Sequence, residues 1–259
     1  MDRPRTTEKY DCPTIACDKS CIIFTNTRTG SSWLSIGLYR AGLGVPMEYF
    51  HQDYIQQFVD RNAIRPHPSE DFSQSYIRTI TDLRTTPNGV FGVKIHTNQW
   101  VDFWKTYEPE HKQNSAYYRQ KLERSFINPH FIFLYRKDML SQAISMYIAQ
   151  ESESWSSEVP AKKQVEYDFD TIKSYLEVTM ENTKFVRSIQ QYTSFPKMTL
   201  TYEELKEDYY GSLRSIASFL NKEIVLTENV GNNTIEKQGN LRNEEWKSRF
   251  LATLKKGRL

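Results

Sequence analysis

Residues 25–32 (TNTRTGSS) hold the side chains best suited to chemistry, and they lie between an apolar run at 21–24 and a helical pattern. A helix that begins near Ser31 presents unpaired backbone N–H groups and a partial positive charge at its first turn. Gly30 allows the backbone to approach a ligand closely, and Arg28 adds a fixed positive charge. Hydroxyl donors come from three further positions, Thr29, Ser31 and Ser32. The segment therefore predicts a binding site for an oxyanion.

The same segment has competing interpretations. It could be an ordinary strand-to-helix turn with a serine cap, because turns rich in Gly and Ser are common. A nucleotide-hydrolase loop requires the pattern Gly-x-x-x-x-Gly-Lys-Ser/Thr, whereas no Lys follows Gly30 and the first Gly is missing. A cysteine phosphatase loop is disfavoured, because Cys21 lies too far from Arg28 and falls within the predicted strand.

Short apolar runs alternate with helical patterns along the chain. Strands are predicted at 21–24, 89–96, 130–135 and 198–201. Helices are predicted at 33–41, 138–149, 169–192 and 202–220. The polar residues 151–168 predict a mobile loop or lid. Buried strands alternating with helices indicate an α/β fold whose central, mostly parallel sheet is flanked by helices on both faces. Ligands of such sheets bind at the carboxyl ends of the strands, which is where residues 25–32 fall.

The composition limits the classes of function. The 259 residues carry a formal net charge of only +2, so an anion site must arise from local placement of cationic groups, and nucleic acid is not an expected partner. An aromatic content of 14% argues for a substantial core. The sequence shows neither a signal-peptide pattern nor an apolar run long enough for a membrane span, so we expect a cytoplasmic protein. Three loosely spaced cysteines without a nearby His predict reduced thiols and no metal site.

A series of segments resembles one enzyme family. Residues 25–34 (TNTRTGSSWL) resemble the 5′-phosphosulfate loop of sulfotransferases that use 3′-phosphoadenosine 5′-phosphosulfate (PAPS). Residues 42–50 (GLGVPMEYF) and 91–99 (FGVKIHTNQ) are similar to segments of the bacterial trehalose 2-sulfotransferase family. Further similar segments follow in family order at 136–145 (RKDMLSQAIS), 201–205, 237–238 and 243–250. The order and spread of these segments carry the resemblance, since no single one is decisive.

The resemblance implies a P-loop-like three-layer sandwich, in which residues 21–259 form a single sulfotransferase domain after an N-terminal extension at 1–20. It implies metal-free, in-line transfer of the sulfuryl group of PAPS to a hydroxyl, and a homodimer as in some relatives. The acceptor is expected to be a sugar, a glycolipid or another small carbohydrate-like alcohol. No motif marks the acceptor site, although the ring of Trp155 could stack on a sugar face.

The resemblance also assigns donor-binding roles. The residues implied at the 5′-phosphosulfate are Arg28, Thr29, Gly30, Ser31, Ser32 and Trp33. Arg136 would bind the 3′-phosphate, with the hydroxyl of either Ser145 or Ser141 as its partner. Lys237 or Arg249 would close over the nucleotide.

Two residues are candidates for the general base that the acceptor hydroxyl requires. Glu48 occupies the position where the trehalose family is thought to place its base, and Lys94-Ile95-His96 resembles the Lys-x-His of cytosolic sulfotransferases, whose His is the base. Lys94 and His96 alternate with apolar residues, so both project from one strand face. We favour Glu48, because a carboxylate near cationic groups stays ionised at pH 7. Arg28 and Lys94 would stabilise the charge that develops during transfer.

Two rival functions remain open from the sequence. A nucleotide kinase would need a loop lysine and a magnesium-binding carboxylate. Asp138 does follow an apolar strand, but Arg136 intervenes and the loop lysine is missing. A non-catalytic nucleotide-binding module is the second rival, and the presence of both Glu48 and His96 argues against it.

Overall fold

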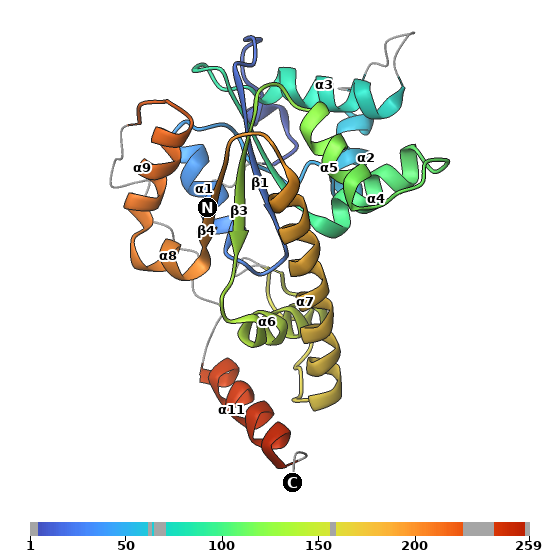
Figure 1. The fold of residues 1–259 in the computed structure, drawn as a ribbon, viewed down its shortest axis with the longest axis vertical. Helices are drawn as coiled ribbons and strands as arrows, with labels where there is room; N and C mark the ends of the chain where they lie inside the picture. The colour runs from blue at the N-terminus through green and yellow to red at the C-terminus, as the bar shows by residue number, and fades with distance from the viewer. Residues whose placement is uncertain (1–4, 62–63, 65–70, 156–158, 225–240, 257–259) are drawn as a thin grey trace.

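The computed structural model describes residues 5–61, 64, 71–155, 159–224 and 241–256 (Figure 1). Within these ranges a four-stranded sheet of order β2-β1-β3-β4 forms the centre. Its strands are β1 (Lys19–Thr25), β2 (Val90–His96), β3 (Pro129–Tyr135) and β4 (Lys197–Thr201). All three neighbouring pairs are parallel, which confirms the predicted sheet. Because Thr25 pairs with His96, the carboxyl ends of β1 and β2 lie side by side.

Helices fill most of the remaining described chain. In order they are the 3-10 turn η1 (Glu8–Tyr10), α1 (Ser31–Arg40), α2 (Gln52–Asp60), α3 (Phe72–Arg84), α4 (Thr97–Tyr107), α5 (Ser115–Arg124), α6 (Met139–Ser152), α7 (Phe169–Tyr192), α8 (Tyr202–Glu207), α9 (Tyr209–Phe219) and α11 (Leu241–Lys256). The single helix predicted at 202–220 is instead two. Asp208 has non-helical backbone angles, and its side chain accepts a hydrogen bond from Gly211 N as the cap of α9.

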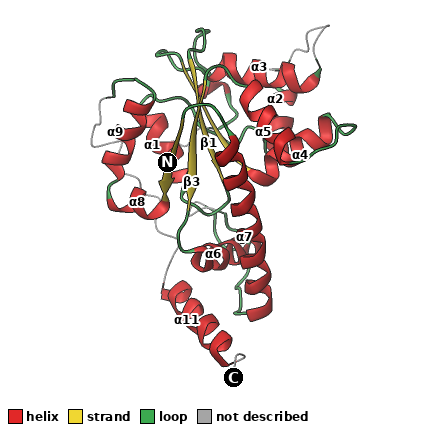
Figure 2. Cartoon of the chain, in the orientation of Figure 1, coloured by secondary structure: helices red, strands yellow, loops and turns green. Residues whose placement is uncertain are grey.

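The sheet has helices on both faces, which makes three layers (Figure 2). Ile22 and Phe24 of β1 pack into one core with residues of α2, α3, α4, α5 and α7. Cys21 and Ile23, which alternate with them, pack into a second core with residues of α1, α8 and α9. The apolar run predicted as a buried strand is therefore apolar because both of its faces are covered.

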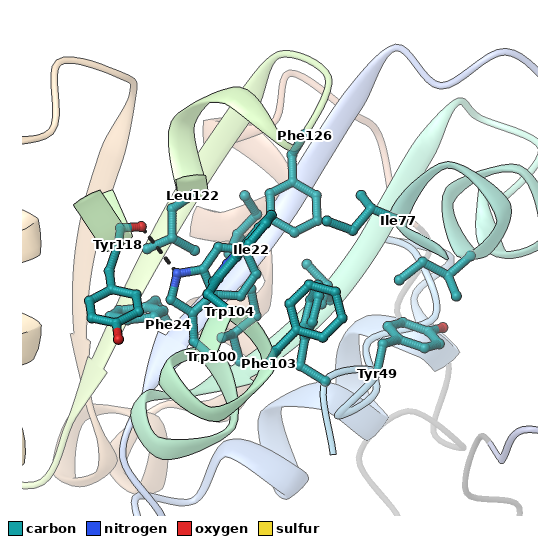
Figure 3. Packing of buried hydrophobic residues seen from close by; sticks show 14 of the residues in the cluster. Ile22, Phe24, Tyr49, Ile77, Trp100, Phe103, Trp104, Tyr118, Leu122 and Phe126 are labelled. Carbon is teal, nitrogen blue, oxygen red and sulfur yellow. Dashed lines mark hydrogen bonds between the residues drawn. The ribbon is translucent and has the colours of Figure 1, made fainter. Parts of the chain in front are cut away.

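Aromatic side chains dominate the core on the α4 side (Figure 3). The ring of Phe50 meets that of Trp100 edge-on at 4.8 Å and that of Phe103 at 4.9 Å. The indole N–H of Trp100 donates to the backbone oxygen of Tyr118 at 3.1 Å. These contacts fix the segment that ends at Phe50, two residues after Glu48, against helix α4.

A third, smaller core joins the C-terminal helix to the rest of the molecule. Trp246 and Phe250 of α11 pack with Ile144 of α6 and Ile172 of α7. At the other end of the chain, Asp11 forms ion pairs with Arg61 and Arg84. No helix within the described ranges combines the length and the apolar character that crossing a membrane would require.

Candidate active site

The loop between β1 and α1 has the predicted strand–loop–helix geometry. Gly30 caps α1 with φ of 81°, and a Cβ atom there would lie 2.7 Å from the ring of Tyr202. Arg28 also has positive φ, 64°, which is uncommon for a residue with a side chain. The Thr29 hydroxyl bonds within the loop, to Thr25 Oγ1 at 2.8 Å and to Asn26 O at 3.0 Å. The loop is thus held by its own contacts, and the first turn of α1 follows it directly.

A carboxylate, an ammonium and an imidazole lie beside this loop. Lys94 Nζ is 2.7 Å from Glu48 Oε1 and 3.1 Å from Ser32 Oγ. His96 Nε2 is 3.4 Å from Ser31 Oγ, and its Nδ1 is 3.7 Å from Glu48 Oε2. Lys94 and His96 therefore project from the same strand face, as predicted. The two candidate bases lie in one site rather than two.

Glu48 is placed by the segment that runs along the outer edge of β2. Met47 forms a parallel bridge with Val93, and Lys94 N donates to Met47 O at 2.9 Å. Gly44, with φ of 90°, approaches β2 so closely that a Cβ would lie 2.5 Å from Gly92 N. The glycines thus allow the close approach that brings Glu48 to Lys94.

The surroundings of Glu48 and His96 lower the pKa of both side chains, which leaves one ionised and the other neutral. Burial alone would raise the pKa of Glu48, but the Lys94 ammonium, His96 and hydrogen bonds from Lys94 and Gln99 lower it well below its usual value. Burial lowers the pKa of His96 to about 4, in spite of the Glu48 carboxylate beside it. At pH 7 Glu48 is therefore ionised and His96 neutral, and either group is able to accept a proton.

Two guanidinium groups belong to this region: Arg28 lies within the loop, and Arg136 follows β3. Arg28 Nε donates to Ser145 Oγ at 2.9 Å and Arg28 Nη1 to Trp155 O at 3.0 Å. Arg136 donates to Arg28 O at 3.3 Å, and its guanidinium lies 4.8 Å from the ring centroid of Tyr202. Burial, followed by the charge of Arg136, lowers the pKa of Arg28 to about 10. A bound anion would relieve this excess of positive charge.

The two candidate serines on α6 differ in their contacts. Ser145 faces Arg28, whereas the Ser141 hydroxyl donates to Asp138 at 2.7 Å as part of the α6 cap. Asp138 also accepts a hydrogen bond from Lys247 of α11. The carboxylate that a kinase would use for magnesium is thus engaged in capping. In the described part of the chain, no cluster of three or more His, Cys, Asp or Glu is placed to hold a metal ion.

The remaining predicted residues lie further out. The ring of Trp33 stacks on Tyr209 at 4.6 Å. Arg249 of α11 lies 4.0 Å over the ring of Tyr167, not on the loop. Lys237 lies outside the described residues, and Trp155 is 45% exposed. A cavity of about 490 Å³ opens beside the loop, and among its lining residues are Arg28, Ser145, Ser152, Lys162, Lys163 and Arg242.

Some contacts at the site were not predicted from the sequence. Gln99 Nε2 donates to Glu48 Oε2 at 2.7 Å, and Gln142 Nε2 donates to Thr27 O at 2.7 Å. The Glu203 carboxylate accepts hydrogen bonds from the backbone N–H groups of Lys137 and Asp138. Gln99 and Glu203 lie within segments that carried the resemblance, but nothing in their spacing indicates these partners.

The chain is similar to several known proteins. Residues 20–253 match the family described as Stf0 sulphotransferase. The trehalose 2-sulfotransferase of Mycobacterium tuberculosis (strain ATCC 35801 / TMC 107 / Erdman) is 22% identical over 89% of this chain and 94% of its own length. Among solved structures, the sulfotransferase domain from the curacin biosynthetic pathway is 13% identical, with a TM-score of 0.46 over 88% of this chain and 83% of that domain. A sulfotransferase from Alicyclobacillus acidocaldarius is 10% identical, with a TM-score of 0.46 over 92% of each chain.

The chain combines a parallel α/β fold with the cluster of Glu48, Lys94 and His96 beside the β1–α1 loop. The match over residues 20–253 makes it a sulfotransferase, because the chain belongs to the Stf0 sulfotransferase family. The predicted fold class and enzyme class are thereby confirmed.

Proposed function

We propose that this enzyme transfers the sulfuryl group of PAPS to a hydroxyl of a carbohydrate-like acceptor, with Glu48 as the general base. One observation carries the proposal: Lys94 contacts both the Glu48 carboxylate, at 2.7 Å, and Ser32 in the first turn of α1, at 3.1 Å. This adjacency supports a base placed beside the transferring anion. The similarity to a trehalose 2-sulfotransferase supports a sugar as the acceptor.

The donor would lie across the carboxyl ends of β1 and β3. The backbone amides at residues 30–32, with Arg28 and Lys94, would bind the phosphosulfate, as charge spreads over the peripheral oxygens during in-line transfer. Arg136 supplies a buried Nε that has no hydrogen-bond partner within the described chain, as expected of a group that awaits a ligand. We assign it, with Ser145, to the 3′-phosphate.

Glu48 is assigned as the base because an acceptor can reach its side chain more easily than that of His96. Its side chain is 24% exposed, against 8% for that of His96. As the new S–O bond forms, Glu48 takes the proton of the acceptor hydroxyl, and the S–O bond to the 5′-phosphate of the donor breaks. The bond pair leaves with 3′-phosphoadenosine 5′-phosphate. His96 would orient Glu48 or the acceptor.

Substitution of the base tests this assignment. Glu48→Gln keeps the shape of the side chain but removes the proton acceptor, so turnover should fall by about 100- to 10,000-fold. Affinity for 3′-phosphoadenosine 5′-phosphate should stay within a few-fold of wild type. Transfer of ³⁵S from labelled PAPS to a panel of sugars, with trehalose first, measures the rate. If His96→Gln abolishes turnover while Glu48→Gln retains it, the two roles are reversed.

The homodimer expected from the resemblance is also a proposal. Sedimentation velocity at micromolar concentration would test it, and a single species with the mass of one 259-residue chain would contradict it.

A further inference from the structure

The amide of Gln99 is bonded at one end only. Gln99 lies in the first turn of α4, three residues after the end of β2, and is 7% exposed. Its Nε2 donates to Glu48 Oε2 at 2.7 Å. Its Oε1 is buried and has no hydrogen-bond partner among the described residues.

The orientation of this amide follows from the charge of Glu48. An ionised carboxylate only accepts hydrogen bonds, and Glu48 Oε1 already accepts from Lys94. If the amide were rotated by half a turn, Gln99 Oε1 would face a carboxylate oxygen at about hydrogen-bond distance, with no proton between them. The N–H end must therefore face Glu48, and the oxygen is left in the interior.

We propose that Gln99 is a positioning residue for sulfuryl transfer, which fixes the Glu48 carboxylate between a donor from α4 and a donor from β2. The inference rests on the proposed role of Glu48 as the base. With Lys94 on Oε1 and Gln99 on Oε2, each oxygen keeps lone pairs for the acceptor hydroxyl. Two donors from separate elements fix the plane of the carboxylate, which one donor alone would leave free to rotate.

The amide group of Gln99 is not explained by a contribution to the stability of the fold. A buried amide oxygen without a partner is unfavourable, and an apolar side chain of the same shape would avoid that cost. Glu48 is 24% exposed, so water is able to replace a lost donor. A purely structural amide would be expected to satisfy both of its ends, as Gln113 does with Trp104 O, Glu108 O and the Tyr118 hydroxyl.

Gln99→Met tests the inference, because it keeps the length of the side chain and removes the amide. Hydrolysis of ³⁵S-labelled PAPS is the assay, with water in place of the acceptor, so the natural acceptor need not be known. We expect kcat to fall by about 10- to 100-fold with little change in the KM for PAPS. The melting temperature should be unchanged or higher. The acid limb of the rate profile should move to higher pH, because a group that holds the pKa of Glu48 low is gone.

Two further variants complete the design. Gln99→Glu keeps the shape and places an acidic group against Glu48, so the acid limb should move further in the same direction. Gln113→Met makes the same chemical change remote from the site, and should lower the melting temperature without altering kcat or the pH profile.

The outcomes separate the inference from the proposed function. If Glu48→Gln hydrolyses PAPS as fast as wild type, the role of Glu48 fails and the inference fails with it. If Glu48→Gln is inactive but Gln99→Met has the kcat and acid limb of wild type, only the inference is overturned. Loss of stability in parallel with activity, as in an ordinary structural variant, would also overturn it.

Discussion

Lys94 influences the charge of both Glu48 and His96. Its ammonium is among the groups that hold Glu48 ionised, and it also disfavours a proton on His96. A carboxylate whose pKa is lowered in this way is a weak base in the resting enzyme. Lys94 also contacts Ser32, in the first turn of α1, where the donor is proposed to bind. We therefore expect the negative charge of a bound donor to attract the Lys94 ammonium and thereby raise the pKa of Glu48.

The buried His96 makes stability depend on pH in the same direction as a paired carboxylate does, but over a higher pH range. Its pKa falls from 6.5 to about 4 on folding, so between these values the unfolded chain binds a proton that the native state does not. Stability should therefore decline as the pH falls from 6.5 towards 4, by up to about 3 kcal/mol from this one group.

Urea denaturation of His96→Gln at pH 7 and pH 4.5 measures this contribution. The variant should lose less stability between the two pH values than wild type, since its side chain does not titrate. His111→Gln serves as the control, because that histidine is exposed on the surface. Equal pH dependence in wild type and His96→Gln would show that His96 is not the group responsible.

At the level of elements, the junction of β1 and α1 depends on one glycine. Gly30 combines a positive φ with close packing against Tyr202, whose ring also lies under the Arg136 guanidinium. A side chain at this position would disturb the loop between β1 and α1 and the predicted 3′-phosphate site together.

Gly30→Ala and Gly42→Ala form a matched pair. Both glycines have positive φ, 81° and 72°, so each substitution should cost about 1–2 kcal/mol of backbone strain. Only at Gly30 would the new Cβ meet another atom, Tyr202 Cδ2 at 2.7 Å, whereas none lies within 4 Å at Gly42. Gly30→Ala should therefore lower the affinity for 3′-phosphoadenosine 5′-phosphate by more than tenfold, and Gly42→Ala should not. Similar affinities in calorimetry would contradict a tight loop.

Most of the strands and helices were predictable from the sequence, but one helix boundary was not. Apolar runs predicted the strands because both faces of this sheet are covered. The alternation of Lys94 and His96 with Val93 and Ile95 predicted that both side chains project from one face of β2. The break at Asp208 was missed, because α8 and α9 contribute to the same core and their apolar spacing continues across it. A capping aspartate within an apparently continuous helix was the available signal.

At the scale of the whole molecule, the site is assembled from segments far apart in the chain. Glu48 precedes α2, Lys94 lies near the end of β2, and Arg136 follows β3. Parallel pairing brings each of them to the carboxyl edge of the sheet. This convergence was predictable from the α/β pattern. The partner of Gln99 and the contacts of Glu203 were not, because they depend on how helices approach the strand ends. The division into residues 1–20 and 21–259 stays a prediction, although β1 already begins at Lys19.

Donor binding tests the central claim most directly. Calorimetric titration with 3′-phosphoadenosine 5′-phosphate in the absence of magnesium, beside ATP with magnesium, compares the two kinds of transferase. The proposed site predicts tight binding of the bisphosphate and weak binding of ATP. Arg136→Ala should reduce the bisphosphate affinity by at least tenfold, through loss of a charged hydrogen-bonding group. Binding of ATP with magnesium in preference to the bisphosphate, or a bisphosphate affinity unchanged by Arg136→Ala, would contradict the account.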